Sequence, residues 1–316
     1  MLRPHIPLLR QTIESKTRRA NPIEIVLPTL PFKDQNPLTT RHSLQSIDLG
    51  EYLFMAQMRD IVVSVKNTYP PGVHLTVLTD GLVYADIFAN GEKDKITQYR
   101  KNCAKIRDDF GLEGKVKIID MMDLVAQEDR FLTVQKQIRN ILGRNNANVQ
   151  GSLAALRRGM LLNIAVPEYS FDEYGSIVNL PEESLPMDIL QRATDASFDY
   201  ASFLLAMQRL DVIQKAFPNA LRATVHPKDA PQLPIHLVNK SSAIFPYNGV
   251  PLVSERKLQS TGSLRKSTRI VRFYEVLRHP DSKAVYAYGE TEPFYYLFCD
   301  SMNGRSSSYS FSNNGE

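Results

Sequence analysis

The hydrophobic pattern of the chain alternates short apolar runs with longer stretches of helical periodicity. Residues 23–27 are apolar apart from Glu24 and are flanked by prolines, which predicts a buried strand. Residues 73–78 are rich in branched side chains and predict a second strand, and residues 116–119 predict a third. Between the first two strands, apolar residues recur at helical spacing from Leu49 onward. Asp48 precedes them and Glu51 follows it three residues later, which is typical of a capping box.

The order of the predicted elements indicates the fold class. A charged helix is expected over residues 93–110, closed by Gly111, so that helices alternate with strands in the first 120 residues. This alternation favours parallel strands joined by right-handed crossovers. We therefore expect an α/β protein with a Rossmann-like, doubly wound, mostly parallel sheet.

The second half of the chain is expected to add a helical insertion and a late β appendage to that sheet. Helices are predicted over residues 129–143, 152–166 and 186–217. The expected strands are 221–225 and 235–238, with 270–277 and 284–288 as an antiparallel pair. The chain is interpreted as a single α/β catalytic domain, 1–300, with its helical insertion at about 129–217. Residues 301–316 are expected to be a mobile tail because they are rich in Ser, Asn and Gly.

Composition and charge limit the classes of function. The 316 residues include 38 basic and 34 acidic side chains, and the modest surplus favours no nucleic-acid partner. One basic cluster, residues 256–269, lies in a Ser/Thr/Gly-rich stretch and is interpreted as a mobile loop. The two cysteines are far apart, and Cys103 lies among apolar residues, which favours a reducing, cytoplasmic location. The apolar patch near the amino terminus is short and interrupted by proline, so neither a secretory signal nor a membrane span is expected.

Polar side chains follow two of the predicted strands. Asp80 and Gly81 come just after the strand at 73–78, and Lys33 follows the strand at 23–27. Ligands of open α/β sheets bind outside the carboxyl ends of the strands, and glycine there permits a close approach of backbone or substrate. Asp-Gly is also common in ordinary turns. The segment therefore predicts either an active-site edge or a simple turn.

A second group of polar residues lies at 221–228. Alternation along a strand places Arg222, Thr224 and His226 on one face, with Lys228 beyond them. Arg and Lys suit a phosphate or carboxylate, and His226 titrates near neutral pH and can move a proton. The simpler alternative is a structural histidine before a proline turn, with Arg222 and Lys228 facing solvent.

The motifs of several other enzyme classes are missing from the sequence. The His279-Pro280-Asp281 dyad has no later histidine to complete an iron triad, and neither His-x3-His nor Cys-x2-Cys occurs, so no metal is expected. Asp80 resembles the second carboxylate of aspartyl phosphatases, but Leu78 occupies the nucleophile position. Nucleotide-binding glycine motifs and the serine hydrolase elbow are also missing, so no cofactor is expected.

Three segments, in this order and spacing, resemble the isocyanide (isonitrile) synthase family, which includes pyoverdine-cluster enzymes and a fungal dityrosine protein. They are Leu30-Pro-Phe-Lys33 with Asp48-Leu-Gly-Glu51, the stretch from Tyr69 to Asp86, and Arg222-Ala-Thr-Val-His-Pro-Lys228. The resemblance implies a cytosolic, cofactor-free enzyme that joins the amine of tyrosine or tryptophan to C2 of ribulose 5-phosphate and forms an isonitrile. It also implies that an iron/2-oxoglutarate oxygenase acts next.

Candidate roles follow from the chemistry that this reaction requires. Lys33, Arg222 and Lys228 can hold the phosphate and the carboxylate, and Lys33 can alternatively form a Schiff base with the ketose. Asp80 can orient or deprotonate the ammonium, and His226 can carry protons. Binding of sugar hydroxyls or of the far end of the amino acid is assigned to further candidates, namely Tyr84, Asp86, Asn248 and Arg157.

The chain departs from the family pattern at one place. Family members commonly carry Pro-Trp-His, whereas this chain has Pro246-Tyr247-Asn248 and no tryptophan. The amide of Asn248 can donate and accept hydrogen bonds but cannot transfer protons at neutral pH. Two rival functions therefore stay open: a sugar-phosphate aldol or transferase activity, and a binding protein that has lost the chemistry.

Overall fold

The computed structural model describes residues 13–15, 17–33, 39–40, 42–87, 92–126, 128–144, 156–157, 160–161, 184–225, 232–239, 244–279, 281–287 and 291–298. The candidate residues His226 and Lys228, the helix expected at 152–166 in all but four positions, and the tail from 301 lie outside these ranges. The division into domains therefore stays a prediction. None of the described helices is both long and apolar enough to cross a membrane.

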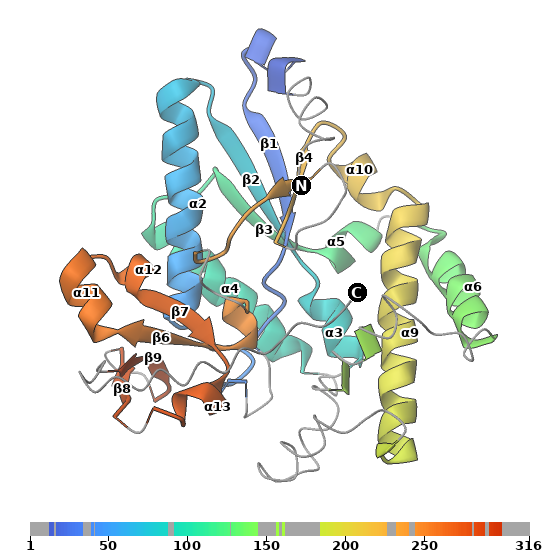
Figure 1. Ribbon diagram of the computed structural model, residues 1–316. Coiled ribbons are helices and arrows are strands. Elements are labelled where there is room, and N and C mark those ends of the chain that lie inside the picture. The colour runs from blue at the N-terminus through green and yellow to red at the C-terminus, as the bar shows by residue number, and fades with distance from the viewer. Residues whose placement is uncertain are drawn as a thin grey trace, which may run out of the picture.

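A five-stranded parallel sheet forms the centre of the molecule (Figure 1). Its strands are β1 (Ile23–Pro28), β2 (Val73–Thr79), β3 (Val116–Asp120), β4 (Leu221–Thr224) and β5 (Leu233–Pro234). Their order is β3-β2-β1-β4-β5, and every neighbouring pair is parallel. The expected mostly parallel α/β sheet is confirmed. The chain moves outward in one direction from β1 and in the other from β4, so the topological switch point lies between these two strands.

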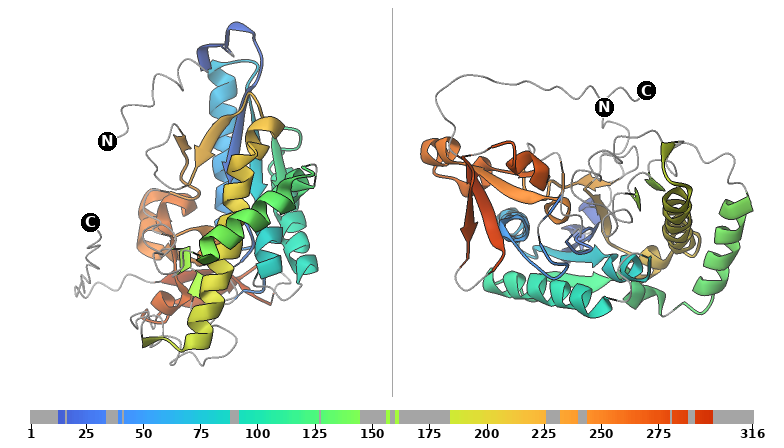
Figure 2. Two further views of the ribbon diagram at one scale, coloured as in Figure 1. Left: turned by 90° about the vertical axis from the view of Figure 1, so that its right-hand side faces the viewer. Right: turned by 90° about the horizontal axis from the view of Figure 1, so that it is seen from below.

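Helices cover both faces of this sheet because its strands are apolar on both sides. In β1, Ile25 and Leu27 pack into one core, and Val26 packs into the other. The first core is shared with α2 (Leu49–Thr68) and α4 (Lys93–Asp109). The second is shared with the remaining helices of this part, which are α3 (Gly81–Ile87), α5 (Met121–Val125), α6 (Phe131–Arg144), α9 (Met187–Arg209) and α10 (Val212–Ala216). In the view from below in Figure 2, α2 and α9 are seen end-on with the strands between them.

Two helix ends show how the sequence sets the boundaries. The predicted capping box is present at the start of α2: the Asp48 carboxylate accepts from the backbone and Glu51 accepts from the Asp48 N–H at 2.9 Å. The single helix expected over 186–217 is instead two helices. Asp211 adopts φ 51°, and this left-handed residue separates α9 from α10.

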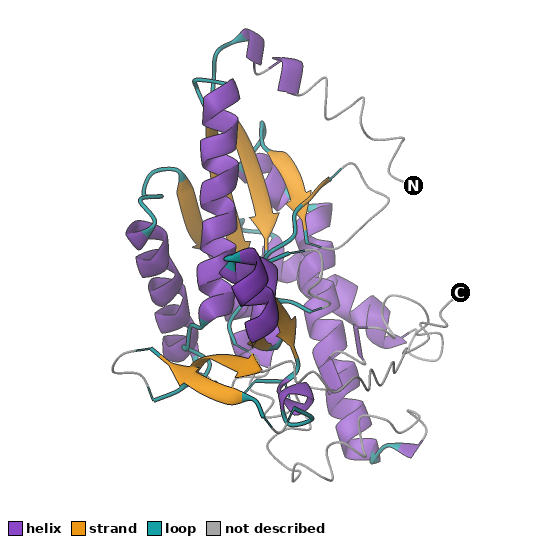
Figure 3. Cartoon of the chain, turned by 60° about the vertical axis from the view of Figure 1, so that its left-hand side comes forward, coloured by secondary structure: helices purple, strands orange, loops and turns teal. Residues whose placement is uncertain are grey.

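A second, four-stranded sheet forms the β appendage (Figure 3). Its strands are β6 (Val250–Ser254), β7 (Thr268–Val271), β8 (Lys283–Tyr286) and β9 (Pro293–Phe298), in the order β7-β6-β9-β8. Its helices are α11 (Glu255–Thr261), α12 (Leu264–Ser267) and α13 (Phe273–Val276), and the short 3-10 helix η4 (Pro246–Asn248) leads into it.

Three sequence predictions in this region were wrong. Strands β7 and β8 do not pair, because β6 and the aromatic strand β9 lie between them, and α13 begins where the strand was expected to continue. The basic stretch at 256–269 forms α11, α12 and the start of β7, because Ser254 and Ser263 cap two short helices. The last parallel strand lies at Leu233–Pro234, two residues before the expected 235–238; the Ile235 N–H still donates to the Thr224 carbonyl at 2.9 Å, and Leu237 and Val238 are buried beyond the strand.

Candidate active site

A cavity of about 970 Å³ opens at the carboxyl ends of the parallel strands. Pro28 and Thr29 line it at the end of β1, Asp80 at the end of β2, and Arg222 on β4. These strands flank the topological switch point, where open α/β sheets bind their ligands. The opposite wall comes from α9, from η4 and from the residue before α13. Two of the predicted site residues, Asp80 and Arg222, therefore line the same cavity.

Asp80 and Tyr200 form the principal acid–base pair of the cavity. The Tyr200 hydroxyl, on α9, donates to Asp80 Oδ2 at 2.5 Å. Burial raises the pKa of Asp80 to about 6, the hydrogen bond from Tyr200 opposes this rise, and Asp120 adds to it. Burial, together with the charge of Asp80, raises the pKa of Tyr200 well above its ordinary value. At neutral pH, Asp80 is thus mostly ionised and can accept a proton, while Tyr200 remains a hydrogen-bond donor.

The position of Asp80 follows from the local fold. Its backbone carbonyl accepts hydrogen bonds from Val83 and Tyr84, so helix α3 begins directly after the strand. Gly81 is required there because a Cβ atom at this position would lie 2.2 Å from the carbonyl oxygen of Pro31. The glycine permits close approach, as expected, but the group that approaches is the backbone of the loop after β1.

Aromatic side chains surround this pair. The rings of Tyr84 and Tyr200 have centroids 4.7 Å apart, and the Phe32 ring meets Tyr84 edge to face at 5.8 Å. Phe245 and Tyr247 stack on each other at 5.4 Å. All five residues line the cavity. The cavity thus offers an apolar, aromatic space directly beside a carboxylate, which suits an aromatic molecule that carries an amine.

Two arginines bring positive charge to the cavity. Arg222 is half-buried on β4, and burial lowers the pKa of its guanidinium. Arg272 follows β7 and is also half-buried. Within the described part of the chain, neither guanidinium has a hydrogen-bond, ion-pair or ring partner. Since an unpaired, partly buried cation is unfavourable, both groups are available to bind an anion.

Lys33 does not line this cavity, so its assignment as a catalytic or anion-binding residue stays a prediction. Its side chain is fully buried, and Nζ lies 2.8 Å from both Asp48 Oδ2 and Glu51 Oε1. Nζ also donates to the carbonyl oxygen of Pro246 at 2.7 Å. Burial opposes the charge of Lys33, but the two carboxylates together raise its pKa above the ordinary value. In this arrangement the ammonium is held by two carboxylates and a carbonyl oxygen rather than turned toward the cavity.

The Lys33 cluster instead holds one wall of the cavity in place. Pro246, whose carbonyl Lys33 binds, is the first residue of η4, and Tyr247 and Asn248 of the same turn line the cavity. Two carboxylates share one ammonium, and burial raises the pKa of Glu51 to about 7 against the opposing effect of Lys33. The capping residues of α2 therefore also compensate a buried charge behind the site.

The other predicted site residues are only partly brought together. Tyr84 lines the cavity as expected, and so does Asn248, whose side chain is exposed. Asp86 lies outside it, because its exposed carboxylate pairs with Lys93 at 2.6 Å on the surface of α3. Arg157 is half-buried next to Leu156, which does line the cavity, but Arg157 itself is not part of the lining.

Sequence reasoning missed Tyr200 and Arg272. Tyr200 lies on the buried face of a long amphipathic helix, and nothing in the periodicity separates it from core residues such as Phe203. Arg272 lies inside the strand expected at 270–277 and carries no motif. A strand-end rule could not have marked it, because β7 ends at Val271 rather than at 277.

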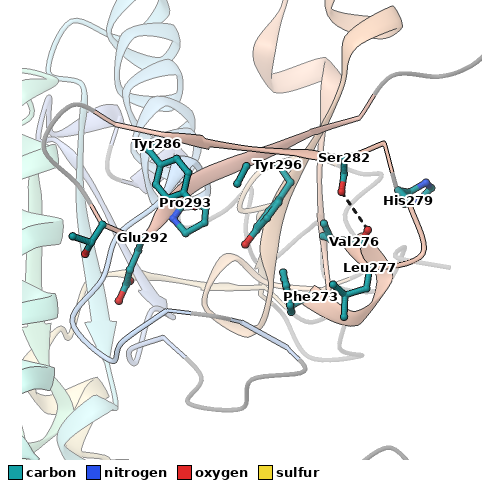
Figure 4. A pocket seen from close by; sticks show the side chains of 11 residues that line it. Phe273, Val276, Leu277, His279, Ser282, Tyr286, Glu292, Pro293 and Tyr296 are labelled. Carbon is teal, nitrogen blue, oxygen red and sulfur yellow. Dashed lines mark hydrogen bonds between the residues drawn. The ribbon is translucent and has the colours of Figure 1, made fainter. Parts of the chain in front are cut away.

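A second, smaller cavity of about 510 Å³ lies within the appendage, beside β8 and β9 (Figure 4). Its charged residue Glu292 is already engaged: although burial opposes its charge, hydrogen bonds from His42, Ser46 and Ser43 lower its pKa to about 2. Its Ser282 hydroxyl donates to the backbone carbonyl of Val276 at 3.4 Å. The polar groups of this cavity serve the fold, so the larger cavity is the better candidate site. Among the described residues, no three His, Cys, Asp or Glu side chains are grouped as metal ligands.

The chain is similar in sequence to several named proteins. The chain is 24% identical over 253 residues to an L-tyrosine isonitrile synthase of Xenorhabdus nematophila, which covers 78% of this chain and 71% of that protein. It is 26% identical to an L-tyrosine isonitrile synthase of Pseudomonas aeruginosa, with 74% and 70% covered. An L-tryptophan isonitrile synthase of Fischerella ambigua is 21% identical, with 81% and 77% covered.

The fold is shared with a solved structure. The crystal structure of the PvcA protein from Pseudomonas aeruginosa superposes with a TM-score of 0.70, at 20% identity, over 91% of this chain and 89% of that one. The sequence profile of one family, described as pyoverdine/dityrosine biosynthesis protein, matches residues 13–176, just over half of the chain. The ordered motifs, the shared fold and this match lead to one conclusion: the chain belongs to the pyoverdine/dityrosine biosynthesis protein family.

Proposed function

We propose that this protein converts the amine of an aromatic amino acid into an isonitrile, with ribulose 5-phosphate as the carbon donor. The observation that carries the proposal is the Asp80–Tyr200 pair, which lies beside aromatic rings in the cavity at the switch point. Relatives that align over about three quarters of the chain bear the names of L-tyrosine and L-tryptophan isonitrile synthases, which supports this class of reaction.

Asp80 meets the first requirement of the reaction. An amino acid carries an ammonium group at neutral pH, and the nitrogen must lose a proton before it can attack a carbonyl carbon. A carboxylate with a pKa of about 6 binds the ammonium while ionised and can accept its proton. Tyr200 holds Asp80 Oδ2 in place, and the second carboxylate oxygen is left for the substrate. We therefore assign Asp80 as the general base and Tyr200 as its positioning residue.

The walls of the cavity suit the rest of the amino acid. Tyr84 and Phe32 offer ring faces and edges beside Asp80, so the aromatic side chain of the substrate can pack there. Arg222 lies on the strand next to β1 and suits the α-carboxylate, because a guanidinium binds a carboxylate through two parallel hydrogen bonds. The expected sugar phosphate adds a second anion, for which the cavity needs a further cation.

The departure at Tyr247 and Asn248 limits which groups can move protons. Tyr247 is buried, and burial raises the pKa of its hydroxyl far above neutrality. The Asn248 amide can bind the substrate but cannot exchange protons at pH 7. Among the described residues that line this part of the site, we assign proton transfer to Asp80, and η4 contributes shape and hydrogen bonds.

The proposal is tested with purified protein and a panel of amino acids that includes tyrosine, tryptophan and phenylalanine. Each is incubated with ribulose 5-phosphate labelled with ¹³C at C2, and the products are analysed by mass spectrometry. We expect one or more aromatic amino acids to yield an isonitrile that carries the label. Turnover of the ketose without any amino acid would instead favour an aldol or transferase activity. Ligand binding with no product across the panel would favour a binding protein.

A further inference from the structure

The cavity contains a second cation that no motif predicted. Arg272 lies between β7 and α13, on the appendage rather than on the parallel sheet. Its side chain is half-buried, and within the described residues its guanidinium has no hydrogen bond, ion pair or ring contact. An arginine that is partly removed from water and faces a cavity without a carboxylate partner is well placed to bind an anionic ligand.

Two further segments meet at Arg272. The N–H of Phe273 donates to the carbonyl of Thr39 at 2.9 Å, so Thr39 lies beside the backbone that carries Arg272. Val250 on β6 pairs with Val271 on β7, and this pairing brings the preceding turn with Asn248 to the same corner. Gly249 makes the approach possible, since a Cβ atom there would lie 2.5 Å from the carbonyl oxygen of Val271. Arg272, Thr39 and Asn248 all line the cavity.

We propose that Arg272, together with Asn248 and Thr39, forms the phosphate-binding subsite for the sugar phosphate. The inference rests on the proposed function and deepens it. A guanidinium, an amide and a hydroxyl from three separate segments line the same part of the cavity and supply several donors, which suits the three oxygens of a phosphate group. Asn248 stands where the family pattern has a histidine, and its neutral amide would donate to the phosphate.

The sheet order assigns the two arginines to different anions. Asp80 follows β2 and Arg222 lies on β4, with only β1 between them; Arg222 is level with Thr76, four residues before Asp80, so their backbones are about 16 Å apart. Both side chains line the same cavity, so we assign the ammonium of an α-amino acid to Asp80 and its carboxylate to the long Arg222 side chain. Arg272 lies on the other sheet and is left for the phosphate at the far end of the ketose. On this proposal, the appendage contributes the phosphate-binding arginine to the site.

The test is isothermal titration calorimetry of the whole protein with ribulose 5-phosphate and, separately, with L-tyrosine. Arg272→Gln removes the charge, Arg272→Lys keeps it without the planar fork, and Asn248→Asp adds a repulsive charge at an exposed position. Arg278→Gln is the matched control, because Arg278 is an exposed appendage arginine that stacks over Tyr274 and does not line the cavity. Circular dichroism checks that each variant is folded.

We expect Arg272→Gln to weaken binding of ribulose 5-phosphate about 10- to 100-fold and to leave L-tyrosine binding within about twofold, as one charge-assisted pair is lost. Arg272→Lys and Asn248→Asp should weaken the same ligand, and Arg278→Gln should change neither. Loss of tyrosine binding alone in Arg272→Gln would make Arg272 the carboxylate site and overturn the proposal. So would unchanged ketose binding, or a wild type that binds no sugar phosphate.

These outcomes are separate from those of the proposed function. Binding needs no turnover, so Arg272-dependent binding of the ketose without isonitrile formation would refute the reaction and support the subsite. Isonitrile formation by Arg272→Gln with an unchanged KM for ribulose 5-phosphate would refute the subsite and support the reaction.

Discussion

Replacing Asp80 by asparagine should make the protein inactive and more stable at the same time. The pKa of Asp80 is raised from 3.8 to about 6, so the folded protein holds its proton more tightly than the unfolded chain. Well below pH 4 the group is protonated in both states and costs nothing. Between about pH 4 and pH 6 the unfolded chain ionises while the folded protein holds the proton, so stability falls across this window and is constant above it. This rise in pKa corresponds to about 3 kcal/mol, which water in the cavity reduces to about 1 to 3 kcal/mol.

The amide introduced by Asp80→Asn cannot ionise, so this variant should gain that amount above pH 7 and nothing near pH 4. For a chain of this size, the gain corresponds to about 2 to 6 °C in Tm. Loss of the general base should lower kcat/KM at least about 100-fold. The wild type should lose activity as pH falls through about 6, because Asp80 becomes protonated. Thermal unfolding at pH 4, 6 and 8, with initial rates of isonitrile formation, measures both effects.

The matched control is Asp86→Asn, six residues along the chain, where an exposed carboxylate pairs with Lys93 outside the cavity. It should change neither activity nor the pH dependence of Tm. An Asp80→Asn protein that keeps its activity would refute the role of Asp80 as base. A Tm difference from wild type that does not grow between pH 4 and pH 8 would refute the reasoning about burial.

Three further substitutions test neighbouring parts of the account. Tyr200→Phe removes a hydrogen bond that lowers the pKa of Asp80. The acidic limb of the pH–rate profile should therefore move to higher pH by about one unit, with activity recovering near pH 9. A limb at the wild-type pH would contradict this. Lys33→Met leaves two buried carboxylates without their cation and should lower the free energy of unfolding in urea by about 3 to 5 kcal/mol. A variant of normal stability that lacks activity would instead support a catalytic role for Lys33. Gly81→Ala forces a Cβ atom against Pro31 and should cost about 1 to 3 kcal/mol, and an unchanged denaturation midpoint would show that this contact is not tight.

Most of the first 120 residues was predictable because the elements there carry local signals, although the short helix α3 directly after Asp80 was not predicted. The apolar runs of β1 and β2, the capping box at Asp48 and the closing Gly111 all lie where the pattern placed them. The appendage was not predictable in the same way. Strands β6 and β9 lie between β7 and β8. Which strands pair in this sheet depends on contacts between distant segments, and the local hydrophobic pattern does not contain that information.

The candidate site likewise contains residues that the sequence pattern marked and residues that it did not. Asp80 and Arg222 line the cavity; the first was predicted from its place after a strand and the second from alternation along residues 221–228. Lys33 also follows a strand, but its side chain turns into the core toward Asp48 and Glu51, and the sequence does not give the direction of a side chain in a loop. Arg272 reaches the cavity only because the appendage folds beside the parallel sheet, so no motif could mark it.

The most direct test of the central claim is a nuclear magnetic resonance measurement on the product. The protein is incubated with ¹⁵N-labelled amino acid and with ribulose 5-phosphate labelled with ¹³C at C2, and the product is examined for a directly bonded ¹³C–¹⁵N pair at the isonitrile carbon. The account predicts a one-bond coupling in the wild-type product and none with Asp80→Asn. An isonitrile without the ¹³C label, or one formed equally well by Asp80→Asn, would contradict it.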